Sequence, residues 1–196
     1  MDTAIYRPTN WLDPMVLSQI FAESSQPLEV DVGCGKGAFL VWAGQTRPAS
    51  NFLGIDRQLA RLSRVDRKVL RAGLTNVRLI RVEASYCIGK LLPTGSVSAY
   101  HIYFPDPWPK RRHHGRRLFQ PEFVTDLLRT LGKGGEVNVA TDDADYFAHI
   151  DGVMSPVLQF QRLEPQELPE EATTEFERLF REAGKSVFRS RYRRCD

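Results

Sequence analysis

The feature that most constrains the fold is a glycine-rich loop between a short apolar segment and a helical one. Residues 28–32 read LEVDV, the loop 33–37 reads GCGKG, and apolar side chains follow at helical spacing through residues 36–47. Glycine permits a tight turn and lets backbone N–H groups approach a ligand, and a helix N-terminus adds the positive end of a dipole. This order predicts an α/β unit that binds a nucleotide-like cofactor. The alternative is that the glycines only turn the chain.

The rest of the chain continues the alternation of strands and helices. We expect strands at 51–56, 76–82, 95–104 and 134–141, and helices at 57–73, 120–132 and 142–154. Short connections between them indicate a mostly parallel sheet with helices on both faces. After an acidic, proline-containing loop, a helix is expected from about residue 174 and an antiparallel C-terminal edge strand at 186–194. We predict a short N-terminal segment, 1–27, and a single domain, 28–196.

Composition excludes several classes of protein. No run of about 18 apolar residues is present, so we expect no membrane span. The start MDTAIYRPTNWLDP has Asp2 and no apolar stretch behind a basic end, so we expect no secretory signal. The three cysteines, Cys34, Cys87 and Cys195, lie far apart and form no CxxC pair. This spacing favours a reduced, cytoplasmic setting and argues against a zinc site.

The net charge of +3 is unevenly distributed. Residues 110–117 contain five Lys/Arg and no acid, and without them 22 Lys/Arg face 24 Asp/Glu. Residues 185–196 hold a second basic cluster. Two basic clusters on an otherwise acidic chain predict a bound polyanion, with a solvated charged face as the alternative. For the arginines of 191–194, we leave open whether they contact RNA or only complete the sheet.

Two carboxylates narrow the choice of cofactor. The glycines fit both a relaxed dinucleotide pattern (Gly33, Gly35, Ala38) and the acid-x-G-x-G-x-G loop of S-adenosylmethionine sites (Gly33, Gly35, Gly37). Asp56 ends the next strand, where it can accept both hydrogen bonds of an adenosine ribose. Asp31 favours S-adenosylmethionine, because an acid repels a pyrophosphate but attracts an ammonium and a sulfonium. Cys34 has no visible base, so we interpret it as a small packing residue.

The stretch YFPDPWPKRRHHGRRL, 103–118, joins a lone acid to a basic strip. Pro105 and Pro107 restrict the backbone on both sides of Asp106. Phe104 and Trp108 are candidates either for stacking on an extruded base or for core packing. No cluster of ligating residues accompanies the two histidines of the strip, so we expect no metal.

Five segments, taken in order, resemble the bacterial-type tRNA (guanine-N7)-methyltransferases. They are DVGCGKGAF, FLGID, YFPDPWPKRRHHGRRL, VATD at 139–142 and TEFERLF at 174–180. Many methyltransferases share the glycine loop, whereas FPDPWPK.RH..RRL is far more restricted. The resemblance runs from about residue 28 to the C-terminus. It implies a Rossmann-like class I fold, S-adenosyl-L-methionine as donor, and methylation at N7 of a guanine in the tRNA variable loop, position 46 in tRNA numbering.

The resemblance also implies roles for individual residues. Its cofactor positions fall on Asp31, Asp56, Glu83 and Asp106, beside Gly33, Gly35 and Gly37 of the loop. Its substrate positions fall on Lys110, Asp142, Thr174, Glu175, Phe176 and Glu177. Three departures are visible: relatives often have Glu at Asp31, Asp at Glu83, and lysine at Gly115. The longer side chain of Glu83 changes the reach of its expected contact with adenine.

The expected chemistry needs no general base, because guanine N7 carries a free lone pair at neutral pH. Catalysis would then depend on positioning. We expect Asp106 to be the catalytic residue that stabilises the positive charge developing on the base. Asp142 and Glu177 are candidates to accept from the Watson–Crick edge of guanine. We expect phosphate contacts from the strip, through Arg111, Arg112, Arg116 and Arg117.

Other functions remain open on the sequence alone. A methyltransferase for another RNA or for a protein amine is the main alternative, although amine-specific enzymes usually carry Asn or Asp before Pro-Pro and an aromatic residue. An NAD-dependent oxidoreductase would need a hydride-handling acid, and we find no candidate. An RNA-binding module would not need a cofactor loop with paired acids. The sequence does not decide between monomer and homodimer.

Overall fold

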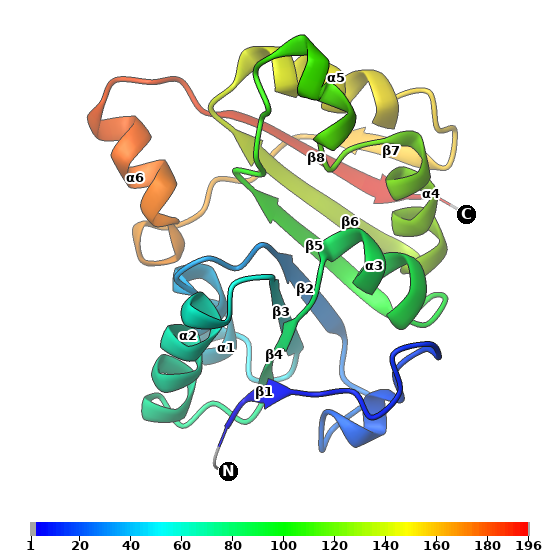
Figure 1. The fold of residues 1–196 in the computed structure, drawn as a ribbon, viewed down its shortest axis with the longest axis vertical. Coiled ribbons are helices and arrows are strands. Elements are labelled where there is room, and N and C mark those ends of the chain that lie inside the picture. Colours follow the sequence, from blue (N-terminus) through cyan, green and yellow to red (C-terminus); the bar gives the residue numbers. More distant parts are fainter. Residues whose placement is uncertain (1–2, 196) are drawn as a thin grey trace.

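The computed structural model describes residues 3–195, and its centre is a mixed sheet in the order β1-β4-β3-β2-β5-β6-β8-β7 (Figure 1). The strands are β1 (Ile5–Tyr6), β2 (Leu28–Val32), β3 (Asn51–Asp56), β4 (Val77–Arg81), β5 (Val97–Tyr103), β6 (Leu131–Thr141), β7 (Phe160–Leu163) and β8 (Phe188–Arg194). The pairs from β1 to β6 are parallel, and β8 is antiparallel to both β6 and β7. The predicted α/β class is therefore confirmed.

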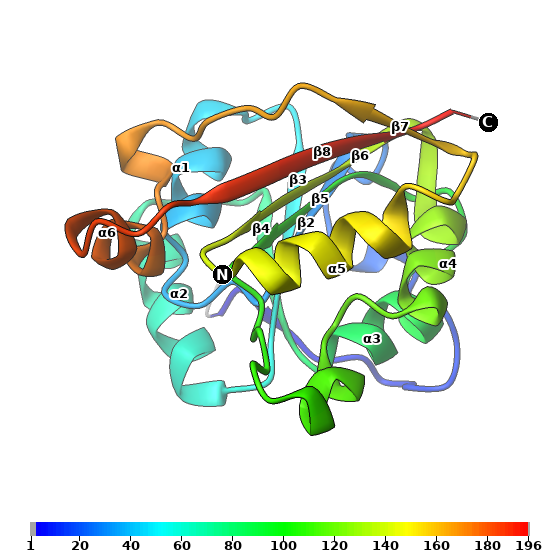
Figure 2. The ribbon, with the colours of Figure 1, turned by 90° about the horizontal axis from the view of Figure 1, so that it is seen from above.

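Helices cover both faces of the sheet (Figure 2). The helices are α1 (Ala38–Thr46), α2 (Leu59–Arg71), α3 (Ala84–Tyr86), α4 (Pro121–Thr130), α5 (Ala144–Met154) and α6 (Glu175–Glu182). Shorter helical turns are η1 (Leu17–Gln19), η2 (Cys87–Leu91), η3 (Arg111–Arg116) and η4 (Glu170–Ala172). Buried side chains of α1, α2 and η4 form one core, and those of η2, α4 and α5 form the other. No helix within residues 3–195 is long and apolar enough to cross a membrane.

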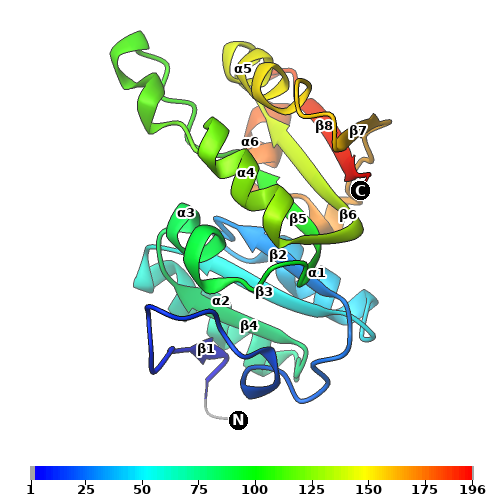
Figure 3. The same ribbon diagram turned by 90° about the vertical axis from the view of Figure 1, so that its right-hand side faces the viewer.

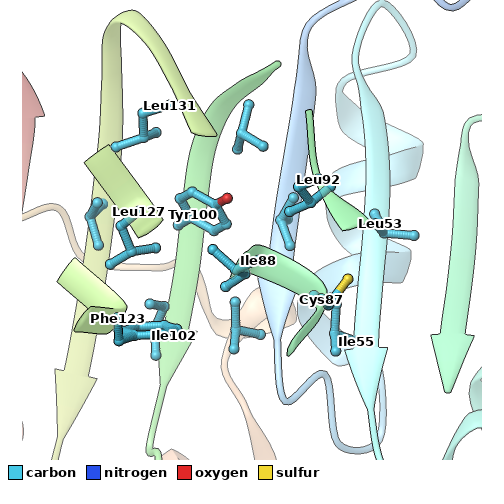
Figure 4. Packing of buried hydrophobic residues seen from close by; sticks show 14 of the residues in the cluster. Leu53, Ile55, Cys87, Ile88, Leu92, Tyr100, Ile102, Phe123, Leu127 and Leu131 are labelled. Atoms are coloured by element: carbon cyan, nitrogen blue, oxygen red, sulfur yellow. The ribbon is translucent and has the colours of Figure 1, made fainter. Parts of the chain in front are cut away.

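The central strands are buried on both sides, as parallel strands between two helical layers must be. Every residue of β2 and β3 is buried. In the larger core, Ile88 of η2 and Leu127 of α4 flank Tyr100 of β5 (Figure 4). The Tyr100 hydroxyl lies 2.6 Å from Thr130 Oγ1, which satisfies a polar group that would otherwise be buried without a partner.

Both edges of the sheet differ from the prediction. β8 is antiparallel, as expected, but it is not the edge strand, because β7 pairs with its outer side. The sequence of β7, FQRL, has one buried residue, so its own pattern gives almost no strand signal. At the opposite edge, β1 comes from the N-terminal segment and pairs with β4. Each of these short strands is defined by its pairing with one neighbouring strand, β1 with β4 and β7 with β8.

Candidate active site

A cavity of about 1050 Å³ opens at the carboxyl ends of the parallel strands. It lies across β2 and β5, which are adjacent in the sheet although the chain runs from β2 away to β3. Such a reversal of strand order is where α/β sheets bind ligands. The predicted residues that line the cavity are Asp31, Gly33, Gly35, Gly37, Asp56, Glu83, Asp106, Arg116, Arg117, Asp142, Thr174, Glu175 and Phe176.

The glycine loop requires its three glycines. Gly33, Gly35 and Gly37 have φ values of 75°, 52° and 72°, in the left-handed region that side chains disfavour. At Gly37 a Cβ atom would also lie 2.5 Å from Cγ1 of Val65 on α2. The backbone N–H groups of Gly33 and Cys34 donate to the carbonyl of Ile55, at 2.8 and 3.0 Å, and hold the loop against the end of β3.

Two acids beneath the loop have unsatisfied hydrogen-bonding capacity. Asp31 is buried, and its burial, reinforced by the charge of Asp56, raises the pKa of its carboxyl to about 8. Asp56 Oδ1 accepts from the Gln58 N–H at 2.8 Å, whereas its Oδ2 is buried without a hydrogen-bond partner. These acceptors fit a ligand with an ammonium and a ribose, as in S-adenosylmethionine. Asp56 would serve the ribose of either cofactor, whereas Asp31 beside the loop suits an ammonium better than the pyrophosphate of a dinucleotide.

Glu83 is the third acid that lines the cavity on the side expected to bind the cofactor. It is the N-cap of α3, where its Oε2 accepts from the Tyr86 N–H at 2.9 Å. The second oxygen is free of that bond, and the side chain is exposed at the cavity. Cys34 in the loop is buried, and burial raises the pKa of its thiol well above the usual range. The thiol therefore stays protonated, which supports the packing role expected for it.

Asp106 is presented by a strained segment of backbone. Phe104 and Trp108, on either side of Pro105-Asp106-Pro107, have φ values of 54° and 45°. Such values are costly for aromatic residues and occur mainly where function requires them. Asp106 is exposed at the cavity and has no hydrogen-bond partner among residues 3–195.

The two aromatic rings beside Asp106 line the cavity, so packing in a core does not explain them. Phe104 lies 5.6 Å from the ring of Phe180 on α6. The guanidinium of Arg116 lies 5.1 Å from the ring centre of Trp108, and His113 meets the ring edge. A flat ligand could stack beside these rings.

The basic strip divides into exposed and buried arginines. Arg111, Arg112 and Arg116 of η3 are exposed, as is its N-cap Lys110, and the η3 turn projects from the molecule (green in Figure 3). Arg117 corrects the prediction: its side chain is 1% exposed and ion-paired to Asp145 of α5. Its Nε also donates to the carbonyl of Pro107 at 2.9 Å. Arg117 therefore anchors the motif to α5 and is not placed to contact a phosphate.

The start of α6 forms the far wall of the cavity. Thr174 is the N-cap of α6, accepting from the Glu177 N–H at 3.1 Å. Glu175 is ion-paired to Lys36 of the glycine loop, and the hydrogen bond from Lys36 lowers the pKa of Glu175. Phe176 is 48% exposed and stacks on Phe180. The Lys36–Glu175 pair, which the sequence did not predict, thus ties the loop to the predicted substrate segment.

Of the two acids expected to read guanine, only one is suitably placed. Asp142 lines the cavity and pairs with Lys185 at 2.8 Å. Glu177 corrects the prediction, because its side chain is fully buried and ion-paired to Arg181 and Arg189. It does not line the cavity. Glu177 therefore joins α6 to β8, and of the two acids only Asp142 lines the cavity.

A buried polar network behind the loop was not predicted. His101 lies 2.7 Å from Glu29 and 2.9 Å from the hydroxyl of Tyr103, which lines the cavity. Burial lowers the pKa of His101. For Glu29, burial would raise the pKa, but His101 and Arg47 outweigh it and lower the pKa. Neutral His101 then donates through Nε2 and accepts from Tyr103 through Nδ1, a tautomer assigned from its partners. The sequence signal that could have predicted this network is the presence of Glu29 and His101 inside mostly apolar strands.

The C-terminal arginines are used inside the protein. Arg191 and Arg193 both bind Glu136, and Arg194 donates to the carbonyls of Leu128 and Leu131. Of the two interpretations left open, these contacts support completion of the sheet. Among residues 3–195, no group of three or more His, Cys, Asp or Glu side chains could hold a metal ion.

The sheet, the glycine loop and the acids at the strand ends define a class I S-adenosylmethionine-dependent methyltransferase. Solved structures share this fold: 16S rRNA methyltransferase KamB has a TM-score of 0.68 at 16% identity, covering 91% of this chain and 94% of KamB. An rRNA methylase from Streptococcus thermophilus has a TM-score of 0.59 at 16% identity, covering 87% and 88%.

Sequence comparison identifies the family. Residues 25–190 match the family described as "Putative methyltransferase". The tRNA (guanine-N(7)-)-methyltransferase of Streptococcus thermophilus is 35% identical over 87% of this chain and 82% of its own length, and that of Nitrosococcus oceani is 34% identical over 92% and 77%. The Paenarthrobacter aurescens protein of the same name is 38% identical, but only 46% of its length is covered. The chain belongs to this family.

Proposed function

We propose that this chain transfers a methyl group from S-adenosylmethionine to N7 of a guanine in the variable loop of tRNA. The observation that carries the proposal is the convergence of three acids on one cavity with exposed arginines beside it. Asp31 and Asp56 offer unsatisfied acceptors on the cofactor side, and Asp106 is free at the opening. Membership of the tRNA (guanine-N(7)-)-methyltransferase family supports the same substrate.

The cofactor would be held by residues of three strand ends. Asp31 would accept from the ammonium, Asp56 from the ribose hydroxyls, and Glu83 would lie beside the adenine. The bound cofactor supplies a methyl group on a positively charged sulfur. Gly33, Gly35 and Gly37 let the backbone approach it without a side chain in the way.

The remaining residues act on the guanine. Its N7 lone pair would form the new bond to the methyl carbon as the carbon–sulfur bond breaks. The sulfur would keep that electron pair and leave as a neutral thioether, so the positive charge would pass to the base. Asp106 would stabilise that charge, since a preorganised carboxylate in a cavity costs no reorganisation during the reaction. Asp142 would accept from the Watson–Crick edge, and Phe104, Trp108 and Phe176 would stack on the extruded base.

At the edge of the cavity and beyond it, the exposed basic residues of the strip would hold phosphates. Arg111, Arg112 and Arg116 lie on the η3 turn, which begins three residues after Trp108, and Lys110 is its N-cap, so the base and its backbone would be bound side by side. Such contacts fix register without reading sequence. We assign the reaction to the cytoplasm, where its tRNA substrate occurs.

Methyl transfer to an unmodified tRNA transcript tests the proposal. With labelled S-adenosylmethionine, label should enter the RNA, and borohydride followed by aniline should cleave the chain at one variable-loop guanine. A transcript with adenine at that position is the control. Label without cleavage would identify another methylation site and overturn the assignment to N7. Label in protein but not in RNA would favour an amine substrate instead.

A further inference from the structure

Helix α2 carries a row of positive side chains that no predicted site includes. Residues 57–71 contain six Lys/Arg and one acid: Arg57, Arg61, Arg64, Arg67, Lys68 and Arg71 against Asp66. At 3.6 residues per turn, positions 61, 64, 68 and 71 fall within about 80° of one another, and at 1.5 Å per residue this row is about 15 Å long. We call these six residues the α2 stripe. Asp66 points elsewhere, accepting from the Ala4 N–H at 2.6 Å.

Most of the α2 stripe has no partner within the protein. Arg57, Arg64, Arg67 and Arg71 are exposed, and their side chains contact no carboxylate or carbonyl among residues 3–195. The C-terminal arginines differ in this respect, since Arg189 and Arg191 bind buried or half-buried carboxylates. The two basic regions look alike in sequence, but only the α2 stripe presents unpaired charge.

This arrangement is unfavourable for the helix itself. Like charges three and four residues apart repel each other, at a few tenths of a kcal/mol per pair. The first turn contains no acid, and Arg57 and Arg61 lie beside the positive end of the helix dipole. Arg61 Nη1 lies 3.7 Å from Asp56 Oδ2, so of these two arginines only Arg61 has a carboxylate partner among residues 3–195. Local stability therefore does not explain the stripe. A polyanionic partner would explain it, because bound phosphates offset both forms of repulsion.

The position of α2 beside the cavity indicates which polyanion the α2 stripe binds. Arg57 and Arg61 line the cavity, and the stripe leads away from it along the helix. α2 follows β3, whereas the η3 turn follows β5, and these two strands lie on opposite sides of β2. The stripe and the η3 turn thus flank the cavity from two sides; α2 is at the lower left in Figure 1. An RNA strand with one base in the cavity has phosphates running both ways from it.

We propose that the α2 stripe is a second phosphate-binding surface for the RNA substrate, so that backbone on both sides of the extruded guanine is held. This inference rests on the proposed function. Lys68 strengthens the connection, because its Nζ donates to the carbonyl of Lys36 in the glycine loop at 2.8 Å. Phosphates bound on α2 would therefore lie next to the loop beneath the cofactor.

The test compares two variants that each remove two exposed positive charges. Arg64→Gln/Arg71→Gln alters the stripe, and Arg7→Gln/Lys90→Gln alters exposed residues that line no part of the cavity. Binding of an unmodified tRNA transcript is measured from low to high salt, with S-adenosylhomocysteine affinity measured alongside. For the stripe variant, the slope of log Kd against log salt should fall by about 1.5, and Kd near physiological salt should rise about tenfold. S-adenosylhomocysteine should bind both variants like the wild type.

Two outcomes would overturn the inference and remain separable from failure of the proposed function. If the wild type methylates tRNA but the stripe variant keeps the wild-type slope, the stripe does not bind RNA, and an acidic protein or membrane becomes its partner. If both variants weaken binding equally, the effect is one of net charge alone. If the wild type neither binds nor methylates tRNA, the proposed function fails instead. Thermal unfolding checks the fold, and the stripe variant should unfold at a temperature at least as high as the wild type.

Discussion

Asp31 should couple binding of the cofactor to release of a proton. Its carboxyl is buried beside Asp56, so its pKa rises from an ordinary value of 3.8 to about 8 in the protein without cofactor. Near neutral pH it is therefore mostly protonated. The ammonium of the cofactor would favour the ionised form, and the proton would leave as the ligand binds.

The raised pKa of Asp31 also makes the free energy of unfolding depend on pH, by an amount that can be calculated. Between pH 3.8 and 8 the unfolded chain has lost this proton while the folded protein keeps it. The unfolded state thus binds fewer protons, and stability falls as pH rises, by up to about 1.4 kcal/mol per pH unit. From pH 6 to 8 this amounts to about 2 kcal/mol, and the loss levels off above pH 8. Saturating cofactor should reduce this pH dependence.

Calorimetry with S-adenosylhomocysteine at pH 6.5 measures the proton directly. The free ligand's amino group is already charged there, since such groups titrate near 7.7–8.0. Titrations in two buffers of different ionisation enthalpy should report release of close to one proton. Asp31→Asn should release none, bind more weakly, and lose the fall in stability between pH 6 and 8. Wild-type binding without proton release would refute the reasoning, because Asp31 would then be either ionised beforehand or distant from the ammonium.

Three further predictions concern single side chains. Asp106→Asn should lower kcat for tRNA methylation at least about 100-fold, whereas a kcat near that of the wild type would remove its catalytic role. Glu177→Gln should lower the free energy of unfolding by about 3 kcal/mol, because it leaves the buried Arg189 unpaired. Glu182→Gln, on the exposed side of the same helix, is the control, and equal urea midpoints for the two would contradict the structure. Gly37→Ala should cost about 1–3 kcal/mol from backbone strain and contact with Val65, and more than Gly73→Ala, where φ is also positive but the space is open. Val65→Ala should recover part of the difference.

Two pairs of similar residues show what could not be predicted from the sequence. Arg116 and Arg117 are adjacent arginines in one strip, yet Arg116 is exposed and Arg117 is buried against α5. Glu175 and Glu177 are two residues apart, yet Glu175 faces the cavity and Glu177 faces β8. In each pair the residue type and local pattern are the same. What differs is a distant partner: Asp145 for Arg117, 28 residues away, and Arg189 for Glu177, 12 residues away.

The sequence by itself determined the parts of this protein that depend on neighbouring residues. The glycine loop needs left-handed backbone at fixed positions, the strands and helices follow from local hydrophobic spacing, and Asp31, Asp56 and Asp106 lie at strand ends or in a proline-bounded turn. Those requirements act within a few residues, so they can be recognised in the amino-acid sequence. Only the tertiary structure decided which charges remain free. Carboxylates from distant elements bind Arg189, Arg191 and Arg193, whereas most of the α2 stripe has no such partner among residues 3–195. Ion pairing depends on distance in space, which a linear pattern does not specify.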